Sequence, residues 1–420
     1  MIGIISIVSA VLSTILLFFM SKTWIIDPNK WITYLAQLTG LIGSVLISIN
    51  FIISIKNNFI ERTFGGLDKL YKIHNIIGNV AFIFILNHPV FLILNSLPLN
   101  TTRLYLIPKL SNLPYAFGIL ALYILIILVI LTIFVDMPYK IWKKTHETMG
   151  LVIIFGSLHS LLITSDVSIY MPLRFWILGI NILALVAYIY KRYIYYLIQP
   201  KNNYRIINID HNKNYLLITL KAIDPENIII FQPGQFAFFS LDKDTRDEHP
   251  FSIFEQENSI VKIGVKITGS FTLGLSQLKI GDEISVRGPF GFFGNSLRKA
   301  NESVWISAGI GITPFLSMLK SLRDDQIVTM IHSARNDEPT IFTNYFNNLA
   351  KNYLNFKFVI HYPSIEGRLN EENIRKYVNL SKQSYVYLCG PKALMDDFSH
   401  KLPSKGVLKK RIIFEDFSFK

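Results

Sequence analysis

Six long apolar segments in the first half of the chain limit what this sequence can fold into. They lie at residues 2–20, 31–55, 73–94, 113–135, 147–164 and 171–190. About 20 mainly apolar residues are enough for a helix to cross a bilayer. No Lys or Arg precedes the first segment and no small-residue cleavage pattern follows it, so we expect a retained helix and not a signal peptide. The sequence therefore predicts a six-helix transmembrane bundle over residues 1–198.

The charge distribution of the chain supports this membrane assignment and sets an orientation. The 420 residues are 51% hydrophobic and 17% charged, with a net charge of +13 and one cysteine. These values exclude a disordered chain and a disulfide-rich secreted domain, and basic residues beside apolar segments favour a membrane over nucleic acid as the partner. Lys and Arg concentrate in the loops after the second, fourth and sixth segments, so the positive-inside rule places both termini in the cytoplasm.

Two pairs of histidines accompany the third and fifth apolar segments. His74 and His88 are 14 residues apart, and His146 and His159 are 13 residues apart. An ionisable side chain at membrane depth is costly, and neutral imidazole is a natural iron ligand. Both segments run outward, so the pairs would lie about 20 Å apart at 1.5 Å per residue. The pattern predicts two stacked haems, an inner one held by His74 and His146 and an outer one held by His88 and His159.

The angular spacing of the histidines conflicts with this arrangement in the fifth segment. At about 100° per residue, a 14-residue step returns to within about 40° of the same face, whereas a 13-residue step misses it by about 140°. We therefore expect a tilted helix or a local distortion near Gly150 or Gly156. The alternative is that all four histidines pack inside the bundle with backbone or hydroxyl partners. Two matched pairs on co-directional helices favour haem over that alternative.

From residue 199 the pattern changes to short alternating strands, which favours an antiparallel β-barrel over residues 199–299. The expected strands lie at residues 204–209, 215–220, 228–231 and 237–241. His249-Pro-Phe-Ser252 follows at a strand edge, where proline is tolerated. Lys266-Ile-Thr-Gly-Ser-Phe-Thr272 ends a strand and opens a helical turn. The amides and hydroxyls of Ser270 and Thr272 are placed to hold a diphosphate at that helix start.

Strands then alternate with helices over residues 300–420, as in a parallel nucleotide-binding sheet. A buried strand at residues 304–308 leads into Gly309-Ile-Gly311-Ile-Thr313-Pro314 and a helix at residues 315–322. Glycines at such a turn let the backbone approach a pyrophosphate. Arg335, after the strand at residues 327–332, favours NADPH over NADH because it would hold the 2′-phosphate; the alternative is a solvated loop charge.

A further strand at residues 384–388 ends in Cys389-Gly390-Pro391, at the sheet edge where ligands bind. We interpret Cys389 as a small strand-end residue near the nicotinamide and not as a nucleophile, because no His or Asp partner is evident. The chain closes on Phe414-Glu-Asp-Phe-Ser-Phe-Lys420, whose aromatic side chains either stack on a ring system or pack.

In this order, the paired histidines, His-Pro-Phe-Ser, Gly-Ile-Gly-Ile-Thr-Pro and Cys-Gly-Pro resemble the NADPH oxidase and ferric reductase superfamily, and the compact length is similar to its bacterial NADPH oxidases. The resemblance implies FAD contacts from His249, Pro250, Phe251, Ser252, Lys266, Gly269, Ser270 and Thr272, and NADPH contacts from Gly309, Gly311, Thr313, Pro314, Arg335, Cys389, Gly390 and Pro391. It also implies a C-terminal aromatic that shields the flavin: Phe419, or Phe417 as the second choice. Phe419 and Cys389 are thus the candidate catalytic residues.

The resemblance implies a multi-pass protein of the cell membrane that moves electrons from NADPH to FAD, to two b-type haems and to an external acceptor. NADPH gives two electrons together, FAD releases them singly, and haem carries one at a time. We expect O₂ as the acceptor and superoxide as the product. A ferric-chelate reductase with the same electron path is the alternative. A non-enzymatic sensor is disfavoured because every cofactor motif keeps its polar or glycine positions. No long insertion is present to receive a regulatory subunit.

Overall fold

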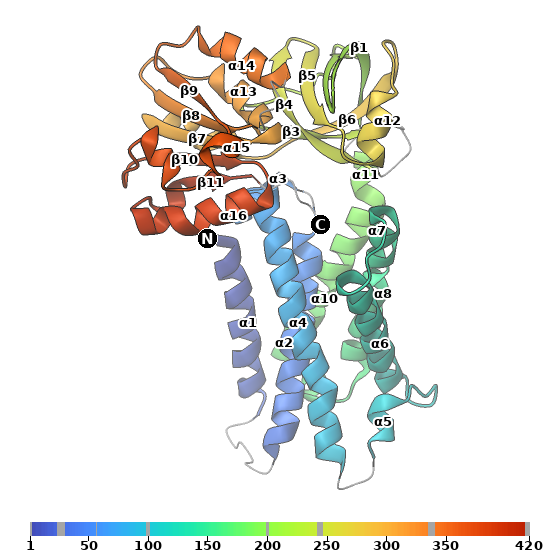
Figure 1. Ribbon diagram of the computed structural model, residues 1–420. Helices are drawn as coiled ribbons and strands as arrows, with labels where there is room; N and C mark the ends of the chain where they lie inside the picture. The colour runs from blue at the N-terminus through green and yellow to red at the C-terminus, as the bar shows by residue number, and fades with distance from the viewer. Residues whose placement is uncertain are drawn as a thin grey trace. The chain divides into compact units, whose positions relative to one another are not determined.

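The chain divides into two compact units, Met1–Ile198 and Gln199–Lys420, and each is described by itself. The computed structural model describes residues 2–22, 30–55, 57–97, 101–198, 201–241, 247–334 and 341–415. The first unit is helical and the second contains two β-sheets (Figure 1). The predicted fold class, a helical membrane domain joined to a barrel and an α/β domain, is confirmed.

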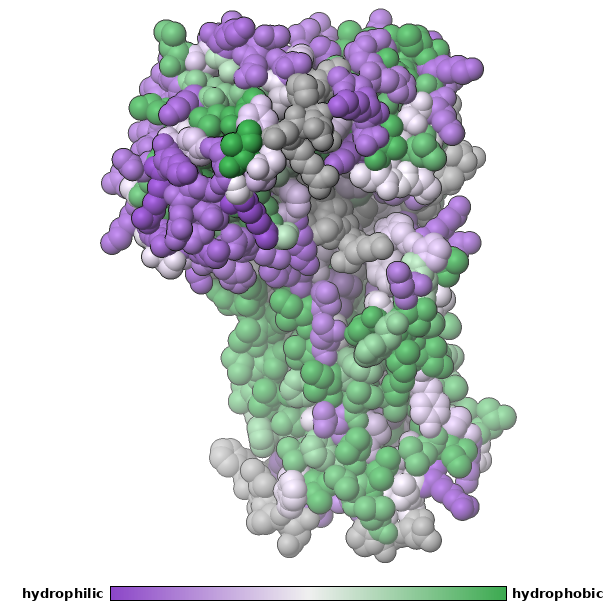
Figure 2. All heavy atoms as spheres, in the orientation of Figure 1, coloured by the Kyte–Doolittle hydropathy of each residue, from purple (hydrophilic) through white to green (hydrophobic). Residues whose placement is uncertain are grey.

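Five helices of the first unit are long and apolar enough to cross a membrane. They are α1 (Ile2–Met20), α2 (Trp31–Ile53), α4 (Leu67–Ser96), α6 (Leu113–Ile133) and α10 (Met171–Ile189). Short helices join them: α3 (Asn58–Phe64), α5 (Arg103–Leu106), α9 (Asp166–Ile169) and α11 (Tyr195–Ile198), the last preceded by a π-helical turn at Tyr190–Ile194. The face drawn in Figure 2 is mainly hydrophobic over these helices. Such a surface suits contact with lipid.

The sixth predicted span is divided into two helices, α7 (Tyr139–Glu147) and α8 (Met149–Leu162). With 14 residues, α8 is about 21 Å long, less than the thickness of a hydrocarbon core. Within the described ranges, five helices and not six therefore satisfy the length of a span. The break at Thr148 coincides with two hydroxyl bonds to preceding carbonyls, from Thr145 to Trp142 (2.8 Å) and from Thr148 to Thr145 (2.6 Å). The expected distortion thus falls two residues before Gly150.

The long helices associate through small and polar residues. α2 packs along α4 and α6 packs along α8 (Figure 1). A Cβ atom on Gly43 of α2 would lie 2.7 Å from the side chain of Ile85 on α4, so glycine permits that close approach. Ser48 of α2 donates a hydrogen bond to Asn181 of α10 over 2.8 Å. The first contact joins α2 to α4, which carries two of the four histidines, and the second joins α2 to α10.

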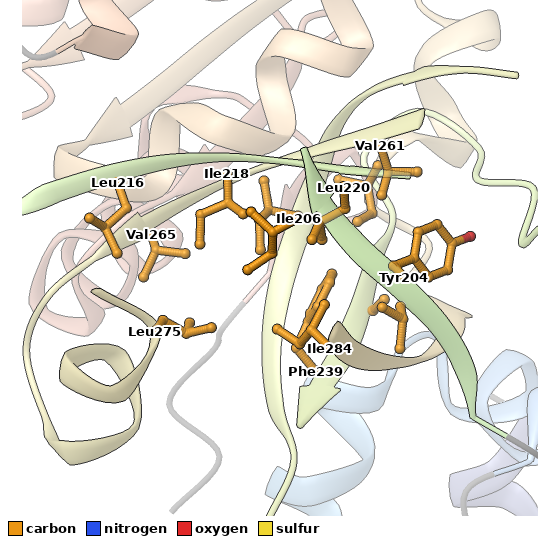
Figure 3. Packing of buried hydrophobic residues seen from close by; sticks show 14 of the residues in the cluster. Tyr204, Ile206, Leu216, Ile218, Leu220, Phe239, Val261, Val265, Leu275 and Ile284 are labelled. Carbon is orange, nitrogen blue, oxygen red and sulfur yellow. The ribbon is translucent and has the colours of Figure 1, made fainter. Parts of the chain in front are cut away.

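A closed barrel of antiparallel strands, in the order β1-β2-β5-β4-β3-β6, begins the second unit. Its strands are β1 (Asn202–Asn212), β2 (Tyr215–Ala222), β3 (Phe236–Ser240), β4 (His249–Glu257), β5 (Ile260–Lys266) and β6 (Glu283–Phe290). Alternate residues of β2 face the interior, where Leu216 pairs with Val265 and Leu220 pairs with Val261 across β5. Figure 3 shows these apolar side chains gathered between the strands. The period-two pattern of the sequence therefore builds the core.

The strand predicted at residues 228–231 is absent, because side chains satisfy the backbone there. The amide of Ile229 donates to the Tyr204 hydroxyl over 3.3 Å. The Gln256 side chain accepts from the amide of Phe231 (2.9 Å) and donates to the carbonyl of Ile229 (2.7 Å). When side chains satisfy the backbone amides and carbonyls of an apolar segment, the segment does not need to pair with a neighbouring strand. This prediction was wrong for that reason.

A five-stranded parallel sheet, in the order β11-β10-β7-β8-β9, completes the second unit. Its strands are β7 (Glu302–Ala308), β8 (Ile327–Ser333), β9 (Phe356–His361), β10 (Tyr385–Cys389) and β11 (Ile412–Phe414). The helices of this unit are α12 (Ser270–Ser276), α13 (Thr313–Leu319), α14 (Ile341–Ala350), α15 (Pro363–Glu366) and α16 (Lys392–Lys401). The sequence analysis did not foresee β11, where Phe414 is an edge-strand residue paired with Leu388.

A buried carboxylate joins the barrel to the parallel sheet. Glu255 on β4 is 8% exposed and bonds to Lys262 on β5 (3.1 Å) and to Lys320 after α13 (2.7 Å). Tyr345 on α14 also donates to it. Burial by itself raises the pKa of Glu255, but the hydrogen bonds from Lys320, Tyr345 and Lys262 outweigh it and lower the pKa from 4.5 to about 2. The ionised form therefore fastens the two layers together.

Replacing Glu255 by Gln tests this interaction through its dependence on pH. A depressed pKa contributes stability that is complete above pH 4.5 and is lost as the pH falls toward 2. We expect E255Q to cost about 2 kcal/mol at pH 7, and the difference from wild type to shrink below pH 4. Thermal unfolding of the full-length protein in detergent, followed by flavin release, measures both effects. Glu257→Gln, an exposed carboxylate on the same strand, is the control and should change neither. A pH-independent loss in E255Q would contradict this account.

Candidate functional site

The first unit brings the four histidines together in the two pairs that the sequence predicts. The ring centres of His74 on α4 and His146 on α7 lie 6.1 Å apart. The ring centres of His88 on α4 and His159 on α8 lie 6.4 Å apart. Thr148 separates α7 from α8, and one histidine from each helix lies beside α4 despite the 13-residue spacing.

The separation of the rings fits one metal ion between each pair. A metal–imidazole bond of about 2 Å places the centre of the ring about 3 Å from the metal. Two imidazoles on opposite sides of one iron therefore have ring centres about 6 Å apart, as both pairs do. In the described residues, no group of three or more His, Cys, Asp or Glu side chains could hold a metal. Two protein ligands suit a haem iron, whose other ligands come from the porphyrin, better than a zinc ion, which needs three or four.

Hydrogen bonds orient the rings of the second pair. Nδ1 of His88 lies 2.6 Å from the carbonyl oxygen of Ala36 on α2, and Nδ1 of His159 lies 2.7 Å from that of Pro114 on α6. A carbonyl only accepts, so Nδ1 of each ring carries the proton and Nε2 is left as the ligand atom. Both histidines therefore have the tautomer that iron ligation requires.

Aromatic rings support the first pair instead. The indole of Trp142 stacks on the His146 ring with centres 5.2 Å apart and planes 12° from parallel. Tyr139, one helical turn earlier, stacks on Trp142 at 5.6 Å. The sequence analysis did not single out Trp142, although its position four residues before His146 places both on one face of a helix.

Phe271 joins the two segments that the sequence analysis assigns to FAD. The ring of His249, at the start of β4, stacks on Phe271 with centres 3.9 Å apart, and Phe251 lies 6.1 Å from the same ring. Phe271 belongs to α12, directly after Gly269 and Ser270. The His-Pro-Phe-Ser strand and the Gly-Ser turn are therefore adjacent, as one ligand touching both requires. The sequence signal was the aromatic residue inside the Gly-Ser-Phe-Thr turn, which the analysis left unused.

Charged and backbone contacts fix both segments. Arg287 on β6 donates to Glu248 over 2.9 Å, and this buried ion pair anchors the residue that precedes His249. Pro250 pairs with Phe238 in the β3–β4 ladder, and Ser252 is buried there. The Thr272 hydroxyl accepts hydrogen bonds from the amides of Gly269 (3.0 Å) and Thr268 (2.9 Å). It therefore shapes the turn. Nζ of Lys266 lies over the ring of Tyr215, 5.6 Å from its centre.

The two motifs assigned to NADPH meet at the carboxyl ends of β7 and β10. These strands are parallel, with Cys389 beside Ser307. A Cβ atom on Gly311 would lie 2.3 Å from the carbonyl oxygen of Cys389, so only glycine fits against that strand end. Gly309 has φ of +56°, a conformation that favours glycine, and open space where a side chain would be. The Gly-Ile-Gly turn and Cys-Gly-Pro thus form one edge of the sheet.

The helix after this turn contacts the barrel. Thr313, buried at the start of α13, donates to the carbonyl of Ile310 over 3.0 Å. A Cβ atom on Gly264 of β5 would lie 2.7 Å from the Thr313 methyl group. Pro314 occupies the first turn of α13, where a missing amide hydrogen costs nothing. The nucleotide motif and the FAD-side barrel are therefore packed against each other within the second unit.

A buried histidine that the sequence analysis missed lies at the same sheet edge. Nδ1 of His332 on β8 is 2.8 Å from the Ser307 hydroxyl on β7, and both residues are buried. Burial lowers the pKa of His332 to about 4, so the ring is neutral near pH 7. Its position could have been found only from the parallel pairing of the two strands. Arg335, Phe417 and Phe419 lie outside the described residues.

Two family models match this chain, one in each unit. Residues 39–157 match the ferric reductase like transmembrane component family, and residues 305–400 match the oxidoreductase NAD-binding domain. Flavohemoprotein A of Dictyostelium discoideum is 25% identical over half of this chain and 58% of that protein. The flavohemoprotein of Rhizobium meliloti (strain 1021) is 30% identical over 34% of this chain and 38% of that protein. The chain thus spans about half the length of the curated relatives it matches.

The fold of a solved structure is also similar. Flavohemoglobin from Malassezia yamatoensis, solved with bound FAD and heme, aligns with 83% of this chain and 98% of its own, with a TM-score of 0.51 and 18% identity. The family matches define the class: an oxidoreductase that joins a ferric reductase-like transmembrane domain to an NAD-binding domain. This combination confirms the resemblance to the NADPH oxidase and ferric reductase superfamily.

Replacing Phe271 by Ala tests whether this ring assembles the FAD segments. We expect the dissociation constant for FAD to rise roughly fivefold, equivalent to about 1 kcal/mol for a lost aromatic pair. Flavin fluorescence on dilution of the purified protein measures it. Leu273→Ala, on the same helix but 52% exposed, is the matched control and should bind FAD as wild type does. Equal FAD affinity in both variants would show that the stacking carries no binding role.

Proposed function

We propose that this protein carries electrons from cytosolic NADPH, through FAD and two b-type haems, to O₂ outside the cell, with superoxide as the product. One observation carries the proposal: four histidines at membrane depth form two pairs, each with the ring separation of two axial ligands on one metal. The family matches on both sides, and relatives whose names join a flavin to a haem, support the same path.

In this path the residues of the chain hold and separate the cofactors. FAD converts two-electron hydride transfer into single-electron steps, and haem carries single electrons. His74 with His146, and His88 with His159, would hold the two haem irons, which would pass on single electrons. The carbonyls of Ala36 and Pro114 hold the Nδ1 protons of the second pair. Gly309, which has open space where a side chain would be, and the neighbouring Cys389 edge would contact NADPH.

The direction of transfer rests on the orientation of the chain. With both termini in the cytoplasm, His74 and His146 hold the inner haem, and His88 and His159 hold the outer one. The basic loops carry this orientation through the positive-inside rule. Arg335 favours NADPH over NADH, and a C-terminal Phe, Phe419 before Phe417, covers the flavin.

A ferric-chelate reductase is the second candidate, and the match of residues 39–157 to the ferric reductase like component favours it. It would use the same residues and differ only at the outer face. The acceptor therefore needs its own test.

Replacing His88 by Leu tests the haem assignment. Wild-type protein should contain two b-type haems per chain, and H88L should contain about one, because a single missing axial ligand removes the outer haem only. Pyridine haemochrome spectra with protein quantification measure the ratio. NADPH should still reduce the flavin in H88L. His400→Leu, an exposed histidine of the second unit, is the control. Wild-type protein without a Soret band would end the haem proposal.

The acceptor is tested with the wild-type protein in liposomes. We expect NADPH-dependent dye reduction that superoxide dismutase suppresses, at a rate that an added ferric chelate leaves unchanged. The ferric reductase alternative predicts the opposite: dye reduction insensitive to the dismutase, and a ferrous product in proportion to NADPH consumed. Activity without any added protein component is part of the expected result, because no regulatory subunit is proposed.

A further inference from the structure

Two glycines lie where His88 and His159 reach the neighbouring helices. Gly40 is four residues after Ala36 on α2, and Gly118 is four residues after Pro114 on α6. A Cβ atom on Gly40 would lie 2.7 Å from Nδ1 of His88, and one on Gly118 would lie 2.9 Å from Nδ1 of His159. Carbon contacts are optimal at about 3.5–4.0 Å, so a methyl group at either place would overlap the ring.

The position of these glycines follows from helix geometry. In an α-helix, residues i and i+4 lie on the same face, and the carbonyl of residue i points toward residue i+4. A side chain at i+4 therefore covers the carbonyl at i from outside the helix. With glycine at i+4, the carbonyls of Ala36 and Pro114 stay open to a second donor, and each accepts one from a histidine over 2.6 and 2.7 Å.

The arrangement occurs twice, on helix pairs that are unrelated in sequence. In the first case, Ala36 and Gly40 on α2 contact His88 on α4. In the second, Pro114 and Gly118 on α6 contact His159 on α8. Glycine is not required in this way throughout the bundle, since a Cβ on Gly156 or Gly179 would have no atom within 4 Å. Nδ1 of His146 has no hydrogen-bond partner in the described part of the chain. The carbonyl contact therefore distinguishes the second pair from His146.

We infer that Gly40 and Gly118 are positioning residues of the His88/His159 haem, each opening a helix carbonyl that fixes the tautomer and plane of one ligand. The inference rests on the proposed haem ligation and adds residues that touch no iron themselves. A hydrogen bond from Nδ1–H makes an imidazole a stronger donor to the metal, which stabilises the oxidised iron. The His88/His159 haem should thus have a lower reduction potential than it would with unbonded ligands.

Gly40→Ala and Gly118→Ala test the inference in the full-length protein. We expect each variant either to lose one haem or to shift the low-spin EPR signal of that haem and raise its reduction potential. The other haem should keep its wild-type signal and potential. The haem that H88L removes identifies the affected one. Gly179→Ala on α10, a helix that carries none of the four histidines, is the control and should leave both haems unchanged.

A measurement on the wild-type protein covers the case in which the alanine variants do not accumulate. Pulsed EPR of protein labelled with ¹⁵N-histidine reports the hydrogen bonding of Nδ1 at each haem. We expect two strongly bonded Nδ1–H groups at the haem that H88L removes. Unbonded Nδ1 groups there, or alanine variants with both signals and potentials unchanged, would overturn the inference. Wild-type protein without haem would instead contradict the proposed function, so the two failures are distinguishable.

Discussion

The helical unit depends on the pairing of four imidazoles at membrane depth. A polar group removed from water requires a partner there, because lipid offers none. The paired ring centres lie 6.1 and 6.4 Å apart, with planes 70° and 64° from parallel, a separation that fits one metal ion between two imidazoles. Thr148 separates the helices that carry His146 and His159, and glycines let α2 and α6 approach the rings of His88 and His159 closely. The outer surface of the unit is mainly apolar, and the imidazoles lie between the helices.

In the second unit, the barrel and the parallel sheet are held in a fixed position relative to each other. Glu255 binds groups from β5, the end of α13 and α14, so the barrel and the parallel sheet share one buried carboxylate. Gly264 and Gly311 allow backbone and side chains to approach closely where the layers and strand ends meet. In the proposed function, hydride transfer depends on the distance between two rings, which a rigid contact between the layers would keep constant.

Much of this arrangement could be predicted from local patterns. Period-two strands such as β2, the Gly-Ile-Gly turn and the histidine spacings are properties of short stretches, and all appear where expected. The misses depend on partners distant in sequence. Residues 228–231 read as a strand because nothing local reveals that Tyr204 and Gln256 bond to their backbone. The Ser307–His332 contact requires the pairing of β7 with β8, and Phe271 matters only once α12 is packed beside β4. The break at Thr148 was anticipated from angles but could not be placed from them.

The two histidine pairs, although similar in ring separation, have different surroundings. His88 and His159 bond to helix carbonyls, whereas His146 stacks under Trp142 and Tyr139. A carbonyl partner donates electron density to the ligand and lowers the potential of the iron, while an aromatic stack restrains the ring with little effect on its proton. In the proposed electron path, these different surroundings would adjust the two haems separately. A haem held by His88 and His159, with the lower reduction potential, would be the better electron donor. The proposed orientation gives this pair the outer position, where the electron leaves the protein.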